Sequence, residues 1–75
     1  MDNTLKEVKS ILAKQLGYSE DQITEDSRLV EDLCADSLDE VEIIMNLEER
    51  FNVTIPDKDA EQMKTVKDIL NFLQK

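Results

Sequence analysis

Apolar residues recur at steps of three and four in three separate segments of this chain. The series are Leu5, Val8, Leu12 and Leu16 near the start, Leu38, Val41 and Met45 in the middle, and Val66, Ile69, Leu70 and Leu73 at the end. This spacing places the apolar side chains of a helix on one face. Only one Gly and one Pro interrupt the 75 residues. The sequence therefore predicts an all-α fold.

The expected helices span residues 4–16, 37–51 and 57–63, with a fourth from residue 66 to the end. Two capping boxes are expected at helix starts, formed by Thr4 with Glu7 and by Thr65 with Asp68. Gly17 suits the left-handed residue that ends a helix. These elements predict a single domain over residues 1–75, a small irregular four-helix bundle with a long loop between helices one and two and a short third helix.

The loop between the first two helices covers residues 18–36 and lacks a sustained apolar period. Its apolar residues are Ile23, Leu29, Val30 and Leu33. A connection of this length is uncommon in a small domain unless it serves a function. We expect these residues to pin an ordered loop to the core, with room for a short helical turn.

The second helix has an apolar sector wider than one core-facing stripe. Its two groups are Ile43, Leu47 and Phe51 on one side and Leu38, Val41 and Met45 on another. Two interpretations stand equally. Either both groups belong to the core, or the second group faces a partner.

The formal net charge is -9, and residues 20–49 contain twelve acidic residues and one basic residue, Arg28. Such a chain is repelled by nucleic acid and by anionic membranes, and it is attracted to basic surfaces. No stretch approaches the roughly 18 apolar residues that a membrane span needs. We expect no nucleic-acid binding, no membrane insertion and a partner with basic patches.

Familiar catalytic and metal-binding patterns are missing from the sequence. The chain has no His, and Cys34 is its single Cys. An internal disulfide, a Cys/His metal cluster and a His-activated nucleophile are therefore excluded. The calcium-binding loop is absent too, because the single glycine, Gly17, precedes the acidic region. We expect a non-catalytic protein, for which a reducing cytoplasm fits best.

Ser37 stands at the expected start of the second helix. With Glu40 it has the spacing of a capping box, and Asp36 with Asp39 nearly has it. From this spacing alone, a capping role is the favoured interpretation of Ser37. If Asp36 caps the helix instead, the Ser37 hydroxyl is left free at the first helical position.

Several short motifs resemble those of acyl carrier proteins. They are Leu16-Gly17 after the first helix, Val30-Glu31-Asp32-Leu33 before the serine, then Asp36-Ser37-Leu38, Leu47-Glu48-Glu49 and Ile55-Pro56-Asp57. A lone Asp-Ser-Leu triplet is a weak signal, but the set spans nearly the whole chain. The sequence is therefore similar to this family.

The resemblance implies that Ser37, between Asp36 and Leu38, carries 4′-phosphopantetheine, which a phosphopantetheinyl transferase delivers from coenzyme A. The thiol of this arm then holds acyl groups as thioesters for the enzymes of fatty acid biosynthesis. Carriers for polyketide, peptide or alanyl transfer share the arm and form one alternative. An unmodified acidic protein-interaction module is the other.

The resemblance also implies two surfaces on a monomeric protein. The partner surface, which meets acyl-processing enzymes with basic docking patches, comprises Asp36, Leu38, Asp39, Val41, Glu42, Met45, Glu48 and Glu49. The acyl-chain cleft is lined by Leu47, Ile55, Ala60, Met63 and Ile69.

Cys34 departs from the family pattern, which usually has glycine at this position. If the backbone there is left-handed, a cysteine costs roughly 1 to 2 kcal/mol. We expect its thiol to be an inert packing group, with a disulfide to the thiol of the arm as the alternative.

Overall fold

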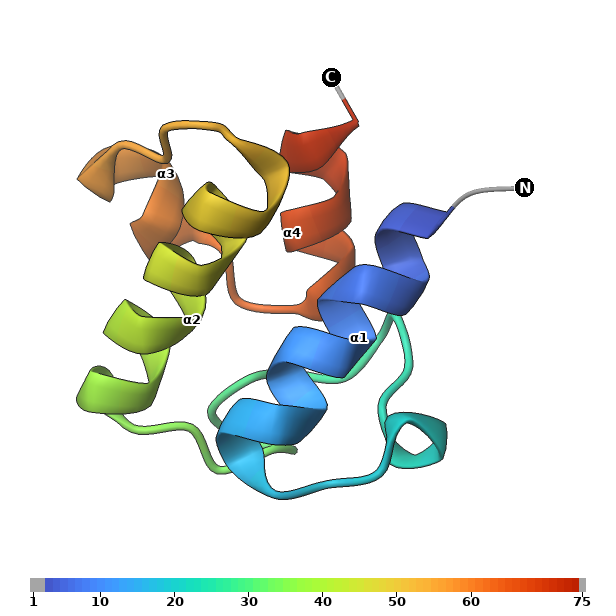
Figure 1. The fold of residues 1–75 in the computed structure, drawn as a ribbon. Helices are drawn as coiled ribbons and strands as arrows, with labels where there is room; N and C mark the ends of the chain where they lie inside the picture. The colour runs from blue at the N-terminus through green and yellow to red at the C-terminus, as the bar shows by residue number, and fades with distance from the viewer. Residues whose placement is uncertain (1–2, 75) are drawn as a thin grey trace.

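The computed structural model describes residues 3–74, and their helices pack as an irregular bundle (Figure 1). The elements are α1 (Asn3–Leu16), the 3₁₀ helix η1 (Glu20–Gln22), α2 (Ser37–Phe51), α3 (Asp57–Gln62) and α4 (Val66–Leu73). The predicted all-α class, the long first loop, the short third helix and the helical turn within the loop are confirmed.

Two of the helix starts carry the cap residues that their sequences favour. At α2 the Asp36 carboxylate accepts a hydrogen bond from the N–H of Asp39 at 2.8 Å. At α4 the Thr65 hydroxyl accepts from the N–H of Asp68 at 3.2 Å, as predicted. The predicted cap at Thr4 is wrong, because α1 already includes Asn3. A residue inside the first turn does not have the extended backbone that a cap requires.

Two residues with positive φ end the longer helices. Gly17 has φ 82°, and its N–H donates to the Ala13 carbonyl at 2.9 Å, so the predicted left-handed ending is confirmed. Asn52 ends α2 with φ 54°, and its N–H donates to the Glu48 carbonyl. Asn adopts the left-handed conformation more readily than most residues, which explains why helix α2 ends after Phe51.

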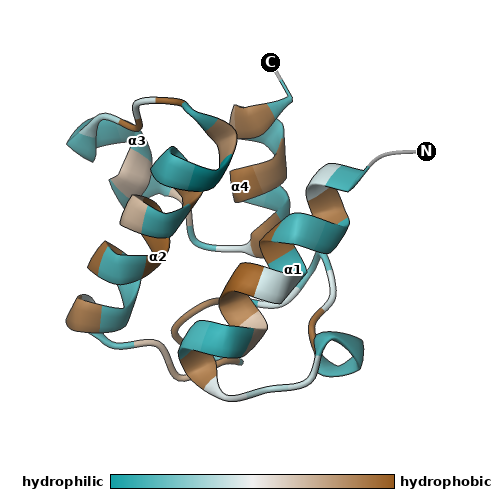
Figure 2. Ribbon diagram, viewed as in Figure 1, coloured by the Kyte–Doolittle hydropathy of each residue, from teal (hydrophilic) through white to brown (hydrophobic). Residues whose placement is uncertain are grey.

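The core forms where α1 packs against α2 and α4. Its fully buried side chains are Val8, Leu12, Ile23, Ile43, Leu47, Val66 and Ile69. Figure 2 shows hydrophobic residues on the facing sides of these helices, and also on the outward side of α2 at its first turn. The apolar periodicity therefore predicts the core-facing sides of α1 and α4 directly, whereas α2 has more apolar residues than its core-facing side contains.

The first loop is ordered by three apolar anchors, of which Leu29 and Leu33 lie just before α2. Ile23, Leu29 and Leu33 are buried as predicted, but Val30 is 53% exposed, so its predicted role as an anchor is wrong. The chain turns here as in a helix, with the N–H of Leu33 donating to the Arg28 carbonyl at 3.0 Å. In such a turn residues four apart share one side, and Val30 points away from it.

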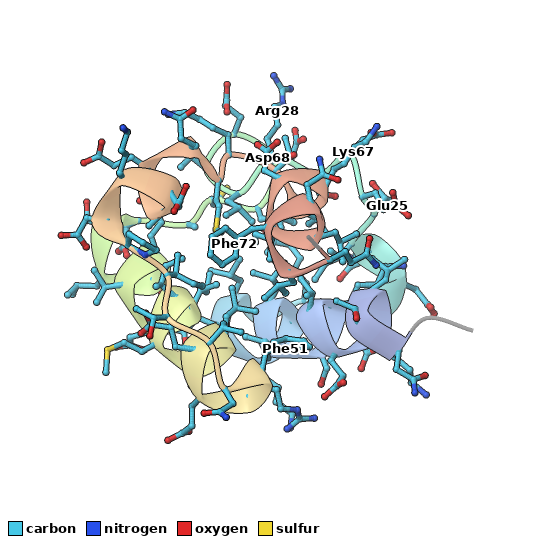
Figure 3. The ribbon with its side chains drawn as sticks, turned by 90° about the horizontal axis from the view of Figure 1, so that it is seen from above. Glu25, Arg28, Phe51, Lys67, Asp68 and Phe72 are labelled. Atoms are coloured by element: carbon cyan, nitrogen blue, oxygen red, sulfur yellow. The ribbon has the colours of Figure 1, made fainter. Side chains whose placement is uncertain are left out.

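The loop is also attached to the segment that joins α3 to α4. The N–H of Leu29 donates to the Lys64 carbonyl at 2.9 Å, and the N–H of Lys67 donates to the Glu25 carbonyl at 2.9 Å. Figure 3 shows Glu25, Arg28 and Lys67 along the same edge of the molecule. These bonds fix the path of the loop, and with it the point where α2 begins.

Candidate functional site

Ser37 is the first residue of α2, and its side chain is exposed. The cap is Asp36, one residue earlier, so the capping role does not fall to Ser37. The Ser37 hydroxyl makes no hydrogen bond within residues 3–74, since every bond at this helix start involves its neighbours. A nucleophilic oxygen thus lies uncommitted at a helix N-terminus, where unpaired N–H groups favour an anion.

The capping box beside Ser37 is tied to α1. The N–H of Asp36 donates to Asp39 Oδ2 at 3.2 Å, and the Gln15 amide donates to Asp39 Oδ1 at 3.2 Å. The same amide donates to Glu42 Oε1 at 2.8 Å. Hydrogen bonds from Gln15 and from the Asp36 N–H hold the pKa of Asp39 below its usual range. Asp39 is therefore held as a carboxylate, with both oxygens engaged.

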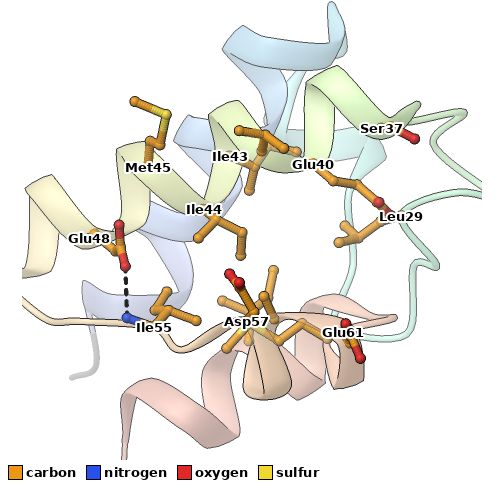
Figure 4. Close-up of a pocket in the computed structure, with 14 residues that line it drawn as sticks. Leu29, Ser37, Glu40, Ile43, Ile44, Met45, Glu48, Ile55, Asp57 and Glu61 are labelled. Atoms are coloured by element: carbon orange, nitrogen blue, oxygen red, sulfur yellow. Dashed lines mark hydrogen bonds between the residues drawn. The ribbon is translucent and has the colours of Figure 1, made fainter.

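A cavity of about 480 Å³ begins beside Ser37 and runs between α2 and the segment that contains α3. Its apolar lining consists of Leu29, Val41, Ile43, Ile44, Met45, Ile55, Ala60, Met63 and Ile69, and its polar lining of Ser37, Glu40, Glu48, Asp57 and Glu61. Figure 4 shows Ser37 near one end and Glu48 with Ile55 near the other. The cavity size lies within the range of about 300 to 1,000 Å³ that is typical of small-molecule sites.

Four of the five residues expected in an acyl-chain cleft line this cavity. They are Ile55, Ala60, Met63 and Ile69. The fifth, Leu47, is fully buried in the core and does not line the cavity, so its predicted place in the cleft is wrong. Leu29 and Ile44 also line the cavity, although the sequence did not predict this. For Ile44, the wide apolar sector of α2 was the sequence feature that could have indicated it.

The outward apolar residues of α2 have no cover within residues 3–74. Leu38 is 72% exposed, Val41 55% and Met45 60%, whereas Ile43 and Leu47 are buried. The interpretation that places both groups in the core is therefore excluded. A row of three large apolar side chains in water is typical of an interaction surface.

The acidic residues expected to meet a partner differ in how they are engaged. Asp36 and Asp39 form the capping box, and the Glu48 carboxylate accepts from the N–H of Ile55 at 2.8 Å. Glu42 shares the Gln15 amide and is exposed. Glu49 is exposed and forms no ion pair or hydrogen bond with residues 3–74 through its side chain.

Cys34 has the left-handed backbone that was expected to strain a non-glycine residue, with φ 60°. It is exposed and free, and its N–H donates to the Val30 carbonyl at 3.0 Å. Partial burial raises the pKa of the Tyr18 phenol, and the neighbouring Cys34 thiol raises it further. The thiol is therefore exposed on the loop near Tyr18, and its predicted role as a packing group is wrong.

No group of three or more Cys, Asp and Glu side chains in residues 3–74 is placed to hold a metal ion. None of the helices described is long and apolar enough to cross a membrane.

Comparisons with known proteins agree on one family. A family model for the phosphopantetheine attachment site matches residues 6–73. An acyl carrier protein of Buchnera aphidicola is 51% identical over 75 residues, covering 100% of this chain and 96% of the relative. An acyl carrier protein of Akkermansia muciniphila is 44% identical over 75 residues, covering 99% and 94%. The structure of a putative acyl carrier protein from Mycobacterium tuberculosis superposes with a TM-score of 0.83 at 31% identity and covers 89% of each chain.

The match to this family model indicates a covalently attached 4′-phosphopantetheine group. The residues present fit such a group. The Ser37 hydroxyl is exposed and uncommitted, as a phosphodiester linkage requires, and a largely apolar cavity begins beside it. By its fold, by this site and by near full-length similarity, the chain belongs to the acyl carrier protein family.

Proposed function

We propose that Ser37 is the attachment serine and that residues 1–75 form a single carrier domain that presents acyl intermediates of fatty acid biosynthesis to successive enzymes. The observation that carries the proposal is the uncommitted, exposed Ser37 hydroxyl at the edge of an apolar cavity. When bound, 4′-phosphopantetheine supplies a terminal thiol that holds an acyl chain as a thioester. The chain itself contributes presentation, not catalysis.

Asp36 has the role of keeping Ser37 available. By capping α2 it satisfies an N–H of the first turn that the Ser37 hydroxyl would otherwise attract. The helix N-terminus favours a phosphodiester on Ser37 by about 0.3 to 1 kcal/mol. The carboxylates of Asp36, Asp39 and Glu40 oppose it, so attachment depends on a phosphopantetheinyl transferase that brings compensating positive charge.

The cavity is the proposed site for the acyl chain. Ile55, Ala60, Met63 and Ile69 form part of its wall, and Ile44 extends the apolar surface on the α2 side. Moving one methylene from water into such surroundings stabilises the loaded protein by about 0.8 kcal/mol. Bound acyl groups are thereby kept from solvent between enzymes.

The proposed partner surface is the outward face of α2. Leu38, Val41 and Met45 supply exposed apolar area, and the exposed carboxylates of Glu42 and Glu49 flank it. Acyl-processing enzymes with Lys or Arg patches would be steered to this face, with rates that fall as salt is added. Such contacts suit a monomeric carrier in the cytoplasm that visits many enzymes in turn.

The test is the intact mass of the purified protein after incubation with coenzyme A and a broad-specificity phosphopantetheinyl transferase. The parent is expected to gain one phosphopantetheine and Ser37→Ala none. Loading with acyl chains of increasing length is then expected to raise the melting temperature stepwise. A folded parent that gains no mass overturns the proposal and leaves an acidic interaction module.

A further inference from the structure

Gln15 makes a contact between helices whose role the proposed function leaves unexplained. It lies in the last turn of α1, and its Nε2 donates to Asp39 Oδ1 at 3.2 Å and to Glu42 Oε1 at 2.8 Å. A primary amide has two N–H bonds, so each carboxylate receives one. The amide also keeps two like charges on neighbouring turns of α2 from facing each other without a donor between them.

The contact continues to the backbone next to Ser37. Asp39 Oδ2 accepts from the N–H of Asp36 at 3.2 Å, and Asp36 Oδ1 accepts from the N–H of Asp39 at 2.8 Å. Gln15 is thus linked through one side chain to the residue that immediately precedes Ser37. Two hydrogen bonds join Gln15 of α1 to α2, and two more form the capping box at the start of α2, where the long loop ends.

We propose that Gln15 is a positioning residue for the modification of Ser37, acting through Asp39 on the first turn of α2. Without the Gln15 amide, Asp39 loses one of its two partners and the capping box can change its geometry. The Ser37 hydroxyl then spends less time in the orientation that an incoming phosphate requires. This inference rests on the proposed function, because it concerns the same serine.

In this role Gln15 affects the chemical step of phosphopantetheine transfer and not the binding of the transferase. Geometry at a nucleophile acts on the rate of the chemical step, so variants of Gln15 lower kcat for phosphopantetheine transfer more than they raise KM. A residue that merely contacted the transferase would mainly raise KM. The pKa of the Asp39 carboxyl reports the contact independently, since the Gln15 hydrogen bond lowers it.

The experiment compares the parent with Gln15→Ala, Gln15→Glu and Gln15→Lys. The first removes the donor, the second adds a third carboxylate, and the third restores a donor in a different shape. Gln62→Ala on α3, an exposed amide, is the matched control. Transfer from coenzyme A is followed by intact mass, and the Asp39 carboxyl is titrated by NMR.

Loss of hydrogen bonds to a charged group predicts that Gln15→Ala lowers kcat roughly threefold to tenfold, with a larger loss in Gln15→Glu. Gln15→Lys is expected to recover most of the kcat, and the pKa of Asp39 is expected to rise in Gln15→Ala. A parent-like kcat in folded Gln15→Ala overturns the proposal, as does a loss that appears only in KM. If the parent itself is not modified, the proposed function fails instead.

Discussion

The carboxylate of Glu48 accepts a hydrogen bond from the backbone N–H of Ile55 at 2.8 Å, which ties α2 to the segment leading into α3 (Figure 4). Both residues line the cavity, and Ile55 is buried. The Glu48 carboxylate is half-buried and already has a backbone N–H as its hydrogen-bond partner. It therefore stabilises the path of the chain and is not free to bind a ligand. Glu48 therefore closes one end of the proposed acyl site.

Replacing Glu48 with Ala is expected to destabilise the fold by about 1 to 3 kcal/mol, because a buried N–H loses its acceptor. Urea unfolding measures the change, and hydrogen exchange at the Ile55 amide locates it. Glu48→Gln keeps an acceptor oxygen and is expected to lose less. Glu49→Ala, at an exposed and unpaired carboxylate, is the control and is expected to change stability by less than about 0.5 kcal/mol. Parent-like exchange of the Ile55 amide in Glu48→Ala would contradict this contact.

Cys34 has a left-handed backbone, so glycine at this position is expected to be more stable than alanine by about 1 kcal/mol. Both variants remove the thiol near Tyr18, so the difference between their free energies of unfolding reports the effect of backbone conformation alone. The greater freedom of glycine in the unfolded chain subtracts part of the gain. Urea denaturation of Cys34→Gly and Cys34→Ala gives the comparison. Equal stability of the two would show that the loop relaxes out of this conformation.

Asp39 predicts a dependence of stability on acid. Its pKa is lowered in the folded protein, so its contribution is present above the ordinary aspartate pKa of about 3.9 and is lost as pH falls through the folded value. The parent is therefore expected to lose stability relative to Asp39→Asn below about pH 4. Unfolding curves between neutral and acid pH test this, with Asp26→Asn as an exposed control. Parallel pH profiles for the parent and Asp39→Asn would refute it.

The helices and two of their caps could be predicted from the sequence because their causes are local. Periodic apolar residues and the Thr65 and Asp68 pair act within a few residues of one another. The cap at Asp36, next to a free Ser37, was likewise one of the arrangements that the spacing allowed. The predicted cap at Thr4 is wrong because α1 already includes Asn3, and the spacing alone does not locate the first residue of a helix.

The rest of the site depends on packing that spacing does not encode. Leu47 and Ile44 both belong to the apolar sector of α2, and only the positions of α1 and α3 decide which one is buried and which lines the cavity. Val30 is apolar like Leu29, yet the turn of the loop points it outward. The contacts of Gln15 and Glu48 join residues brought together by tertiary structure.

Added salt is expected to raise the melting temperature of this protein. The net charge is -9 and the acidic residues concentrate in residues 20–49, so the folded state is weakened by its own repulsion at low ionic strength. Screening over about 10 Å, reached near 0.1 M salt, reduces that repulsion. The exposed Arg50–Glu7 pair, with 2.6 Å between Nε and Oε1, is also screened, but such pairs contribute less than about 1 kcal/mol.

Thermal melts across sodium chloride concentrations test this prediction. The rise in melting temperature with salt should be smaller in a variant that combines Glu20→Gln with Glu49→Gln. A melting temperature insensitive to salt would show that self-repulsion does not limit this fold.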